Sequence, residues 1–495
     1  MRIPFDRQSA TPLYQQIESY LKEQIISGVL LAETRLPSTR ALAKDLGVSR
    51  ITVQNAYMGL ESDGLIYNRE GSGAYVMSSF ALPVANRDTA ITWPQWQENL
   101  ESEIGQPPRF SPTILSNPSA DELIAFTGVG DTQHFPIKDF QRALQSVLRT
   151  DGIKALSYGE NSRGYPPLRE TISHMLASQG IRAATAQILI TSGSQQALSL
   201  VCRLLLNPAD TILVENPTYN FALALFNLIG LNVIGIPSDK NGMQTERLEA
   251  LIQKHHPRLI YTIPNFQNPS GADMSGQRRR QLIALAQQYD IPILEDDFVG
   301  DLRYDGRAQP AIKALDPGGY VIYIGTFSKM LMPGVRLGYL VAEGPVLEKL
   351  EESKRTQDLS TSALLQHALN RYVSVGRYQS HLRRSIRLYR GRRDAMLEAI
   401  QRYLPAEILL HPPKGGLFVW MQLPEPISAL ELLPFAAHHG ISYAPGSWFT
   451  ISPQDGEGYL RLNFAVQTPE KIDLGIQRLG KAMEQLASRK RTRKN

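Results

Sequence analysis

The stretch GTFSKMLMPGVRLGY, residues 325–339, combines a reactive lysine with groups that bind anions. Lys329 follows the apolar run YVIYI, whose pattern predicts a buried strand. A lysine in such a site can lose its proton and attack an aldehyde, giving a Schiff base. Thr326, Ser328 and Arg336 supply hydroxyl and guanidinium donors for a phosphate group. The stretch therefore has the chemistry of a cofactor anchor.

Residues 120–485 alternate short apolar runs with amphipathic stretches. The strand-like runs are QILITSG, TILVEN, NVIGIPS, RLIYTIP, PILEDD and YVIYIGTFSK, and helical stretches such as QQALSLVCRLLL and RRRQLIALAQQY separate several of them. This alternation predicts an α/β domain with a mainly parallel sheet covered by helices. Ligands bind such sheets at the carboxyl ends of the strands, which is where the polar clusters of this sequence fall.

Two of these clusters follow early strands. SGSQQA lies between a strand and a helix, so Gly193, Ser194 and Gln195 predict a phosphate seat of backbone N–H groups. Tyr219 of ENPTY could stack on a flat heterocycle, although such a tyrosine is more often a packing residue.

Two further clusters carry an amide and a carboxylate. Asn268 of PNFQNPSG follows a strand and could hydrogen-bond a phenolic oxygen, unless it belongs to a simple Pro/Gly turn. Asp296 of ILEDDF ends a buried strand, where a carboxylate is costly unless it is paired. A protonated pyridine nitrogen is a suitable partner, and a helix cap or salt bridge is the ordinary alternative. The order of all these features along the chain favours a cofactor site over coincidence.

This series resembles that of fold-type I aminotransferases, in the motifs YGENSRGYPPLR, SGSQQA, NPTY, QNPSG, EDD and TFSKMLMPGVRLGY. The resemblance implies a sheet with helices on both faces and a smaller C-terminal α+β part. It also implies pyridoxal 5'-phosphate as cofactor, bound to Lys329 as a Schiff base, with Asp296 on its pyridine nitrogen. Asn268 would meet the ring's 3-oxygen, and Tyr219 would stack on the ring.

The same resemblance assigns two more residues and marks one departure. Arg461 in YLRLNFA matches the arginine that holds a substrate carboxylate; a sheet-end surface arginine is the alternative. Tyr158 in SYGENSRG matches a tyrosine that reaches the phosphate of the partner subunit. Family members usually show EDDY, whereas this chain has Phe298, which cannot donate a hydrogen bond to the 3-oxygen. The loss should change the pKa of the Schiff base, while cofactor binding should survive.

The first eighty residues have the pattern of a winged helix. PLYQQIESYLKEQIISG carries apolar residues four apart and predicts a helix that ends near Gly28. Ser38 can cap a second helix, TRALAKDL, and Ser49 can cap a third, RITVQNAYMGLESDG, after a turn at Gly47. Two short helices joined by a tight turn form a helix-turn-helix. YNREGSGAYV then predicts a β-hairpin wing, whose turn holds Gly71 and Gly73.

Basic side chains gather where this domain would meet DNA. Between Arg35 and Thr52 there are four basic residues against Asp45 alone. Arg50 and Thr52 would face the groove next to the cap Ser49, and Arg40 and Arg69 could hold phosphates or guanine edges. The alternative is a helical domain that docks onto protein. The motifs PLYQQI, LPSTRALAKDLGVSRITV and GSGAYV resemble the winged-helix domain of GntR-type bacterial regulators.

The rest of the sequence bounds the molecule. With 495 residues, 42% hydrophobic and 20% charged, the chain is typical of a globular protein of two or three domains. No membrane span or signal peptide is expected, which predicts a cytoplasmic location. Cys202 is the only cysteine, which excludes a disulfide framework and a cysteine metal site, and no metal is predicted.

Two segments outside the domains have biased compositions. Residues 78–119 contain six prolines and no sustained periodicity, which predicts a linker. Residues 486–495 end in RKRTRKN and are expected to form a disordered basic tail. We favour a solvated charge run there over a weak hold on DNA phosphates.

The two modules together resemble MocR/GabR-type transcriptional regulators. That resemblance implies a homodimer on double-stranded DNA with paired half-sites. The effector would be an amine or amino acid that exchanges with Lys329, or pyridoxal phosphate itself. The main alternative is a working aminotransferase whose head only controls its own expression or location. A third possibility is an interaction scaffold with a dead site, which the presence of Lys329, Asp296 and Arg336 disfavours.

Overall fold

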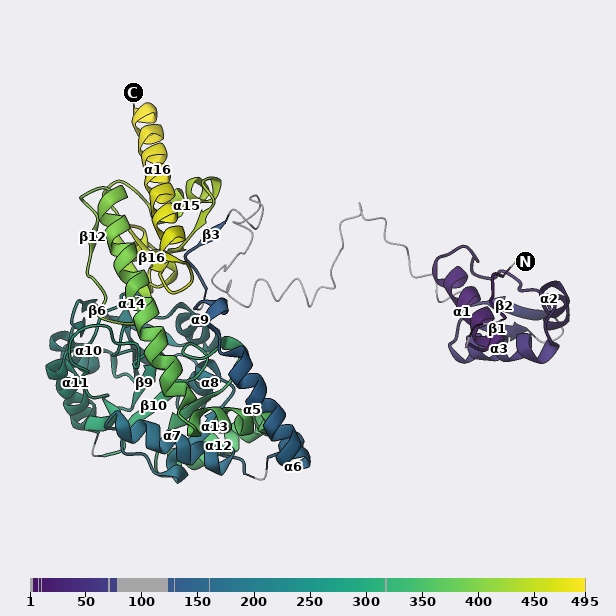
Figure 1. Cartoon of the computed structure of the whole chain (residues 1–495), viewed down its shortest axis with the longest axis horizontal. Coiled ribbons are helices and arrows are strands. Elements are labelled where there is room, and N and C mark those ends of the chain that lie inside the picture. The colour runs from purple at the N-terminus through teal and green to yellow at the C-terminus, as the bar shows by residue number, and fades with distance from the viewer. Residues whose placement is uncertain are drawn as a thin grey trace. The chain divides into compact units, whose positions relative to one another are not determined.

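The computed structural model describes residues 3–77 except 8, 10, 70 and 71, and residues 123–494 except 129, 160 and 317. The chain divides into two compact units, Met1–Ser102 and Glu103–Asn495 (Figure 1). The predicted linker, residues 78–119, and the wing residue Gly71 lie outside the described residues.

The first unit confirms the predicted winged helix. Its elements are α1 (Leu13–Ile26), α2 (Thr39–Leu46), α3 (Arg50–Ser62), β1 (Ile66–Arg69) and β2 (Gly73–Val76), the two strands being paired antiparallel. The hydroxyl of Ser38 accepts a hydrogen bond from Ala41 N, so it caps α2 as expected. Gly47 ends α2 with φ 62°, a left-handed conformation that glycine adopts without steric cost.

The second unit is built on an eight-stranded sheet. The strand order is β4 (Ile188–Thr191), β11 (Gly338–Val341), β10 (Val321–Thr326), β9 (Ile293–Asp297), β8 (Leu259–Thr262), β5 (Thr211–Asn216), β6 (Asn232–Asp239) and β7 (Gly242–Met243). Pairing is parallel from β10 through β9, β8 and β5 to β6, whereas β11 and β7 are antiparallel to their neighbours. The six predicted strands are confirmed, and they all point the same way.

Successive side chains of each strand enter different cores. Ile260, Ile293 and Val321 pack against α10 (Leu248–His255) and α11 (Gly276–Tyr289). The alternate residues, such as Tyr261 and Leu294, belong to the core on the other face, which includes α8 (Ser194–Leu205) and α9 (Asn220–Ile229). The strands are therefore buried on both faces, as a parallel sheet requires.

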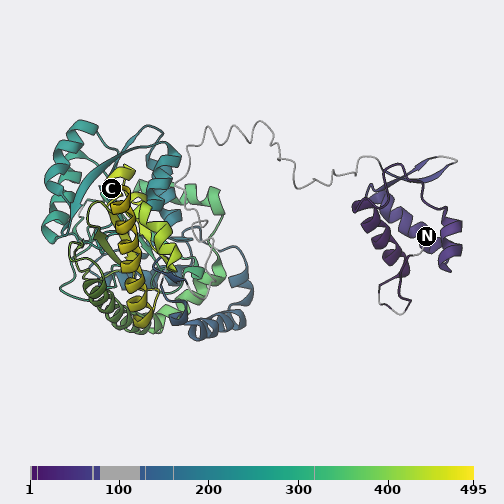
Figure 2. The ribbon, with the colours of Figure 1, turned by 90° about the horizontal axis from the view of Figure 1, so that it is seen from above.

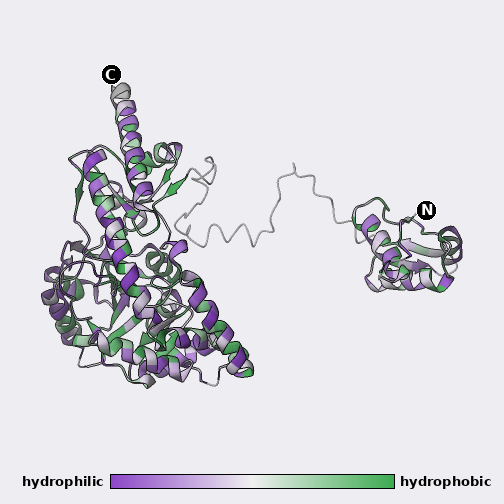
Figure 3. Cartoon of the chain, in the orientation of Figure 1, coloured by the Kyte–Doolittle hydropathy of each residue, from purple (hydrophilic) through white to green (hydrophobic). Residues whose placement is uncertain are grey.

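Further helices surround the sheet, as the two views of the ribbon show (Figures 1 and 2). They are α5 (Ile137–Thr150), α6 (Gly152–Leu156), α7 (Pro166–Ser178), α12 (Pro345–Asp358) and α13 (Ala363–Ser374). The helices carry hydrophobic and hydrophilic residues in turn along their length (Figure 3), as expected for helices with one face in the core.

The predicted smaller C-terminal α+β part is present. It holds the antiparallel sheet β12 (Leu409–Leu410), β13 (Phe418–Gln422), β16 (Tyr459–Asn463) and β15 (Ala444–Pro445), with α14 (Arg377–Tyr403), α15 (Ala429–His438) and α16 (Pro469–Lys494). A short parallel pair joins β3 (Ile124–Ala125) to β14 (Ile441–Ser442), so the first described strand of this unit packs on its C-terminal part.

The expectation of a disordered basic tail is wrong. Helix α16 continues through the tail to Lys494 (Figure 1), because its buried face extends to Leu486 and lysine and arginine are good helix formers. Lys490 also donates to the carbonyl of Pro426, at 2.8 Å, and pairs with Glu431. None of the helices in the described part of the chain is long and apolar enough to cross a membrane.

Candidate cofactor pocket and DNA-binding surface

The predicted pocket residues gather at the carboxyl edge of the parallel sheet. Gly193 follows β4, Tyr219 follows β5, Asn268 follows β8 and Lys329 follows β10, while Asp296 is the penultimate residue of β9. Since these strands are parallel, their carboxyl ends meet at one edge. Residues separated by more than a hundred positions in the sequence are thereby brought into one site.

Lys329 lies within the electric field of three other pocket residues. Burial, together with the positive charges of Arg461 and Arg336, lowers the pKa of its ammonium to about 8, against the opposing effect of Asp296. At pH 8 about half of the lysine is therefore neutral amine, the form that attacks an aldehyde. An exposed lysine at the same pH would be almost entirely charged.

Asp296 is a buried carboxylate, and one of its two oxygens accepts no hydrogen bond from the described residues. Only 4% of the residue is exposed, and burial raises its pKa to about 7. Its Oδ2 accepts a hydrogen bond from the hydroxyl of Tyr261 at 3.0 Å. Its Oδ1 has no hydrogen-bond partner among the described residues. A buried acceptor of this kind calls for a donor, and the protonated nitrogen of a pyridine ring fits that need.

The residues predicted to form a phosphate seat lie at the N-terminus of α8. Gly193 precedes the helix with φ 118°, and a Cβ added there would come within 3.1 Å of Arg336 Nη2. Arg336 also donates from Nη2 to the carbonyl of Ser192 at 2.9 Å, which fixes its guanidinium beside the helix. Ser194 and Gln195 form the first turn of α8, so their backbone N–H groups lack partners within the helix.

The two predicted hydroxyl donors are used differently. The Thr326 hydroxyl accepts from Ser328 N at 3.1 Å and lies 3.4 Å from the carbonyl of Leu337, so it shapes the turn before Lys329. The buried Ser328 Oγ has no partner among the described residues and is free to donate to an anion.

Arg461 and Asn268 determine one another's orientation. Arg461 Nη1 donates to Asn268 Oδ1 at 2.7 Å, which leaves the amide nitrogen of Asn268 as a donor for a ring oxygen. The guanidinium contacts the rings of Phe418 and Phe449, with its central carbon 4.1 and 4.6 Å from their centroids. Its buried Nε has no partner among the described residues, so one edge can receive a carboxylate.

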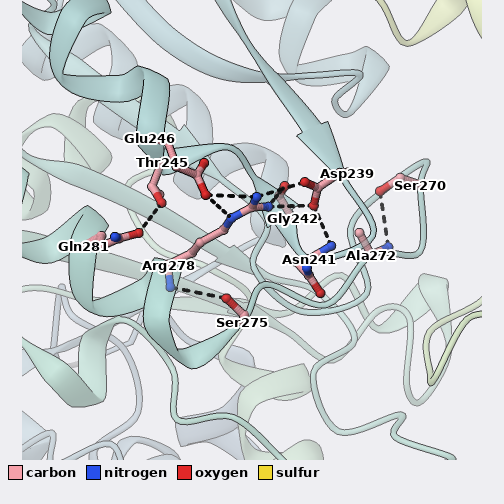
Figure 4. A network of polar contacts seen from close by, with 10 residues as sticks. All are labelled: Asp239, Asn241, Gly242, Thr245, Glu246, Ser270, Ala272, Ser275, Arg278 and Gln281. Carbon is pink, nitrogen blue, oxygen red and sulfur yellow. Dashed lines mark hydrogen bonds and ion pairs between the residues drawn. The ribbon is translucent and has the colours of Figure 1, made fainter.

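The loop that carries Asn268 is supported at both ends. At its start, the buried carboxylate of Glu215 accepts from Thr262 Oγ1 at 3.1 Å and from Ile263 N at 2.9 Å. At its end, Ser275 caps α11 by accepting from Arg278 N (Figure 4).

Arg278 then pins the neighbouring hairpin to α11. It donates to both carboxylate oxygens of Asp239, at 2.6 and 2.9 Å, and also to Gly242 O and Glu246, as Figure 4 shows. The loop that carries Asn268 is therefore held by hydrogen bonds at both its start, near Glu215, and its end, near Ser275.

Phe298, which stands where the resembling family usually has a tyrosine, packs against another aromatic ring. It is 8% exposed, and its ring stacks at 6.3 Å on that of Phe418, which in turn faces Arg461. Phenylalanine has no hydrogen-bond donor, so this position donates none to a cofactor, as expected. Its contact here is the apolar ring of Phe418.

Tyr219 and Tyr158 occupy different places. The charges of Asp296, Arg461 and Arg336 all act on Tyr219, whose pKa burial raises, so Tyr219 belongs to the pocket. Tyr158 is 79% exposed and lines a separate hollow with Ser162 and Leu359. Its assignment to a partner subunit's phosphate stays a prediction.

The first unit presents the predicted DNA contacts at its surface. The side chains of Arg40, Arg50 and Arg69 are exposed. Ser49 caps α3 by accepting from Thr52 N at 3.1 Å, and its hydroxyl lies 2.8 Å from that of Thr52. The cap therefore holds both hydroxyls at the start of the third helix.

Within the wing, Arg69 at the end of β1 lies beside a tyrosine ring of β2. The Arg69 guanidinium lies 5.8 Å from the centre of the Tyr75 ring, and Gly73 opens β2 with φ 114°. The DNA roles of these residues stay predictions.

Sequence reasoning missed three pocket residues. Tyr261 orients Asp296, and the signal for it was a tyrosine in the buried run RLIYTIP, because a buried hydroxyl needs a partner. Phe418 and Phe449 hold Arg461 from distant parts of the chain. They carry no local signal, since aromatic residues in apolar segments usually pack in a core.

The comparisons with known proteins agree with both units. Residues 128–479 match the family described as aminotransferase class I and II, and residues 13–76 match the gntR family of bacterial regulatory proteins. The HTH-type transcriptional regulator YdfD of Bacillus subtilis is 34% identical over 480 residues, which cover 97% of this chain and 98% of YdfD.

Two further comparisons concern the whole chain and the aminotransferase-like part. The probable rhizopine catabolism regulatory protein MocR of Rhizobium meliloti is 29% identical, over 98% of this chain and 96% of MocR. The crystal structure of LysN, an α-aminoadipate aminotransferase of Thermus thermophilus, is 32% identical with a TM-score of 0.73, over 80% of this chain and 100% of that chain. It was solved in complex with N-(5'-phosphopyridoxyl)-L-leucine.

The fold and the matches together define a DNA-binding domain joined to an aminotransferase-like domain. The chain belongs to the HTH-type transcriptional regulators of MocR type, in which a GntR-type domain is fused to a domain of the aminotransferase class I and II family. The cofactor of the latter family is pyridoxal phosphate. The unpartnered Asp296 Oδ1, the free Ser328 hydroxyl and the close packing of Gly193 on Arg336 fit that group.

Proposed function

We propose that the aminotransferase-like domain of this regulator senses a small amine or amino acid, or pyridoxal phosphate itself, and that DNA binding responds. One observation carries the proposal: Lys329 lies close enough to Arg461 and Asp296 for their charges to shift its pKa, and Asp296 Oδ1 and Arg461 Nε have no hydrogen-bond partner among the described residues. In a chain whose full-length relatives are named as regulators, such a complete ligand site is best explained as a sensor.

Pyridoxal phosphate, when bound, supplies an aldehyde that condenses reversibly with amines. Lys329 provides the resident amine, and its lowered pKa keeps it reactive near neutral pH. Asp296 would face the protonated pyridine nitrogen of the cofactor, and the Asn268 amide would donate to its ring oxygen. Arg461 would bind the carboxylate of an incoming amino acid and so hold its amino group near Lys329.

An amine ligand that took the place of Lys329 on the cofactor would have a means of changing the protein. The Lys329 amine would then be a free side chain beside Arg461 and Arg336, whose charges already act on it. A ligand shifts DNA affinity only if it binds two arrangements of the protein with unequal affinity. A freed lysine and a newly paired Arg461 are differences from which such a preference can arise.

We infer that the protein acts as a homodimer. Ile153 and Leu156 of α6 are 85% and 66% exposed, and Tyr158, which follows them, is 79% exposed. Leu359, 62% exposed, lines the same hollow as Tyr158. A second copy of the chain would cover this apolar face, and Tyr158 could then reach the partner subunit's phosphate seat. Two DNA-binding domains would meet paired half-sites.

The visible spectrum of the cofactor-loaded protein tests the sensor. We expect one class of amine or amino acid to shift the absorption band and then to leave it unchanged, even when a keto acid is added. The same compound should alter the affinity for operator DNA, and Lys329→Ala should abolish both responses. A compound that shifts the spectrum without any change in DNA affinity would refute the sensor.

The alternative, a catalytically active aminotransferase, is favoured by the likeness to LysN and by the presence of Lys329, Asp296 and Arg461. It predicts that an amino acid and a keto acid drive repeated cycles of the spectrum with turnover. That result would make the regulatory role secondary. A protein that takes up no cofactor would contradict both proposals.

A further inference from the structure

The third helix of the DNA-binding domain exposes an apolar side chain at its start. Ile51, the second residue of α3, is 68% exposed. The core of the domain is served by another face of the helix, which carries Val53, Ala56, Tyr57 and Leu60. Ile51 therefore contributes little to folding, and a polar residue there would cost the domain nothing.

The surroundings of Ile51 suit the major groove. The neighbouring Arg50 is exposed, and Gln54 and Asn55 lie one turn further along on the same exposed side. From Ser49 to Leu60 the sequence contains no acidic residue. The first acids after this stretch are Glu61, in the last turn of α3, which accepts from Asn68 at 2.8 Å, and Asp63, which pairs with Lys22 at 2.6 Å. The first three turns of α3 therefore present no acidic side chain to a phosphate-lined groove.

We propose that Ile51 reads the C5-methyl group of a thymine in each operator half-site. The inference rests on DNA binding by the GntR-type domain and deepens it. Among the DNA bases only thymine presents a methyl group in the major groove. The first turn of a recognition helix is the part that reaches base edges, and the capped start of α3 fixes that turn.

The side chain is also suited to this role by its stiffness. A β-branched residue in a helix has one strongly preferred χ1 rotamer, so little freedom is lost on binding. Gln54 and Asn55 add amides, which pair well with adenine. The face as a whole therefore favours A·T pairs over G·C pairs at the positions it touches.

The test begins with the full-length protein and a random double-stranded DNA library, from which the bound sequence is selected. A short duplex of that sequence is then made with each thymine replaced in turn by deoxyuridine, which lacks only the methyl group. We expect one position per half-site at which the replacement weakens binding about four-fold, the effect of removing one buried methyl group. All other replacements should be close to neutral.

Variants then assign the effect to Ile51. Ile51→Ala should bind the thymine and deoxyuridine duplexes equally, whereas Ile51→Val, which keeps a branched side chain, should retain most of the preference. Met58→Ala is the matched control, because Met58 is 59% exposed on the same helix but two turns from its start. It should retain the full preference.

Three outcomes would overturn the proposal. Wild-type protein could bind all deoxyuridine duplexes equally well, or select no sequence at all. Ile51→Ala could keep the preference for thymine. Ile51→Ala could change the oligomeric state while leaving the preference intact, which would assign Ile51 to a protein contact. The spectral response to amines is measured separately and needs no DNA, so failure of the sensor and failure of this inference are distinguishable.

Discussion

Asp296→Asn should have opposite effects on stability and on cofactor binding. Asp296 is buried, and burial raises its pKa from 3.8 to about 7. Between these two pH values the folded protein binds more protons than the unfolded chain, so its stability falls as pH rises and then stays constant above pH 7. Without cofactor, the charged carboxylate is thus a destabilising feature at neutral pH.

The size of the effect follows from the shift. About three pKa units correspond to about 4 kcal/mol above pH 7, of which roughly 2 to 3 kcal/mol develops between pH 5 and pH 8. Asparagine has the same shape, can still accept from the Tyr261 hydroxyl and carries no charge. The cofactor-free variant should therefore lose less stability than wild type over this pH range. Its affinity for pyridoxal phosphate should fall roughly thirty-fold or more, because a buried charge partner is lost.

Chemical denaturation of cofactor-free protein at several pH values, with cofactor titration by absorbance, measures both effects. Asp301→Asn is the matched control: burial raises the pKa of Asp301 to about 6, but its oxygens accept from Gln179 and Tyr378 and none of its partners is a pocket residue. It should show a weaker pH effect and unchanged cofactor affinity. The reasoning fails if Asp296→Asn destabilises the cofactor-free protein at pH 8, or if cofactor affinity is unaffected.

Three further changes have defined outcomes. Arg461→Met should remove the spectral response to amino acids while sparing simple amines, because only the carboxylate needs the guanidinium; an equal loss for both would contradict this. Phe298→Tyr should lower the pH of the cofactor's visible transition by adding a donor at the ring oxygen, at a cost of about 1 kcal/mol or less in stability, since Phe298 packs on Phe418. Ser49→Ala should destabilise the DNA-binding domain by about 1 kcal/mol, as expected for a lost helix cap, and weaken DNA binding without changing the cofactor spectrum.

Much of the fold could be predicted because its signals are local. Each strand of the large sheet is a short apolar run, each polar cluster follows such a run, and parallel pairing places their ends together. The helix caps at Ser38 and Ser49 are equally local, since the side chain bonds to the backbone three residues on.

The features that sequence could not provide depend on contacts across the chain. Arg461 contacts both Phe418 and Phe449 because β16, which carries it, pairs with β13, which carries Phe418, and with β15, which Phe449 follows. The basic C-terminal tail was expected to be disordered from its charge alone. Its helix is determined instead by the buried face that precedes it and by the contacts of Lys490.

The pocket itself explains how occupancy could be sensed. It holds a buried carboxylate whose Oδ1 has no hydrogen-bond partner among the described residues, a lysine whose charge burial opposes, and a partly buried arginine whose Nε has no such partner. Each of these is unfavourable while unpaired, and cofactor plus amino acid would pair all three. Binding to the folded state alone stabilises it in proportion to the logarithm of ligand concentration. Elements that end in the pocket, such as α8 and the Asn268 loop, should therefore become more ordered on binding, as hydrogen exchange with and without ligand can measure. If protection there is unchanged, the signal must travel through rearrangement of rigid parts instead.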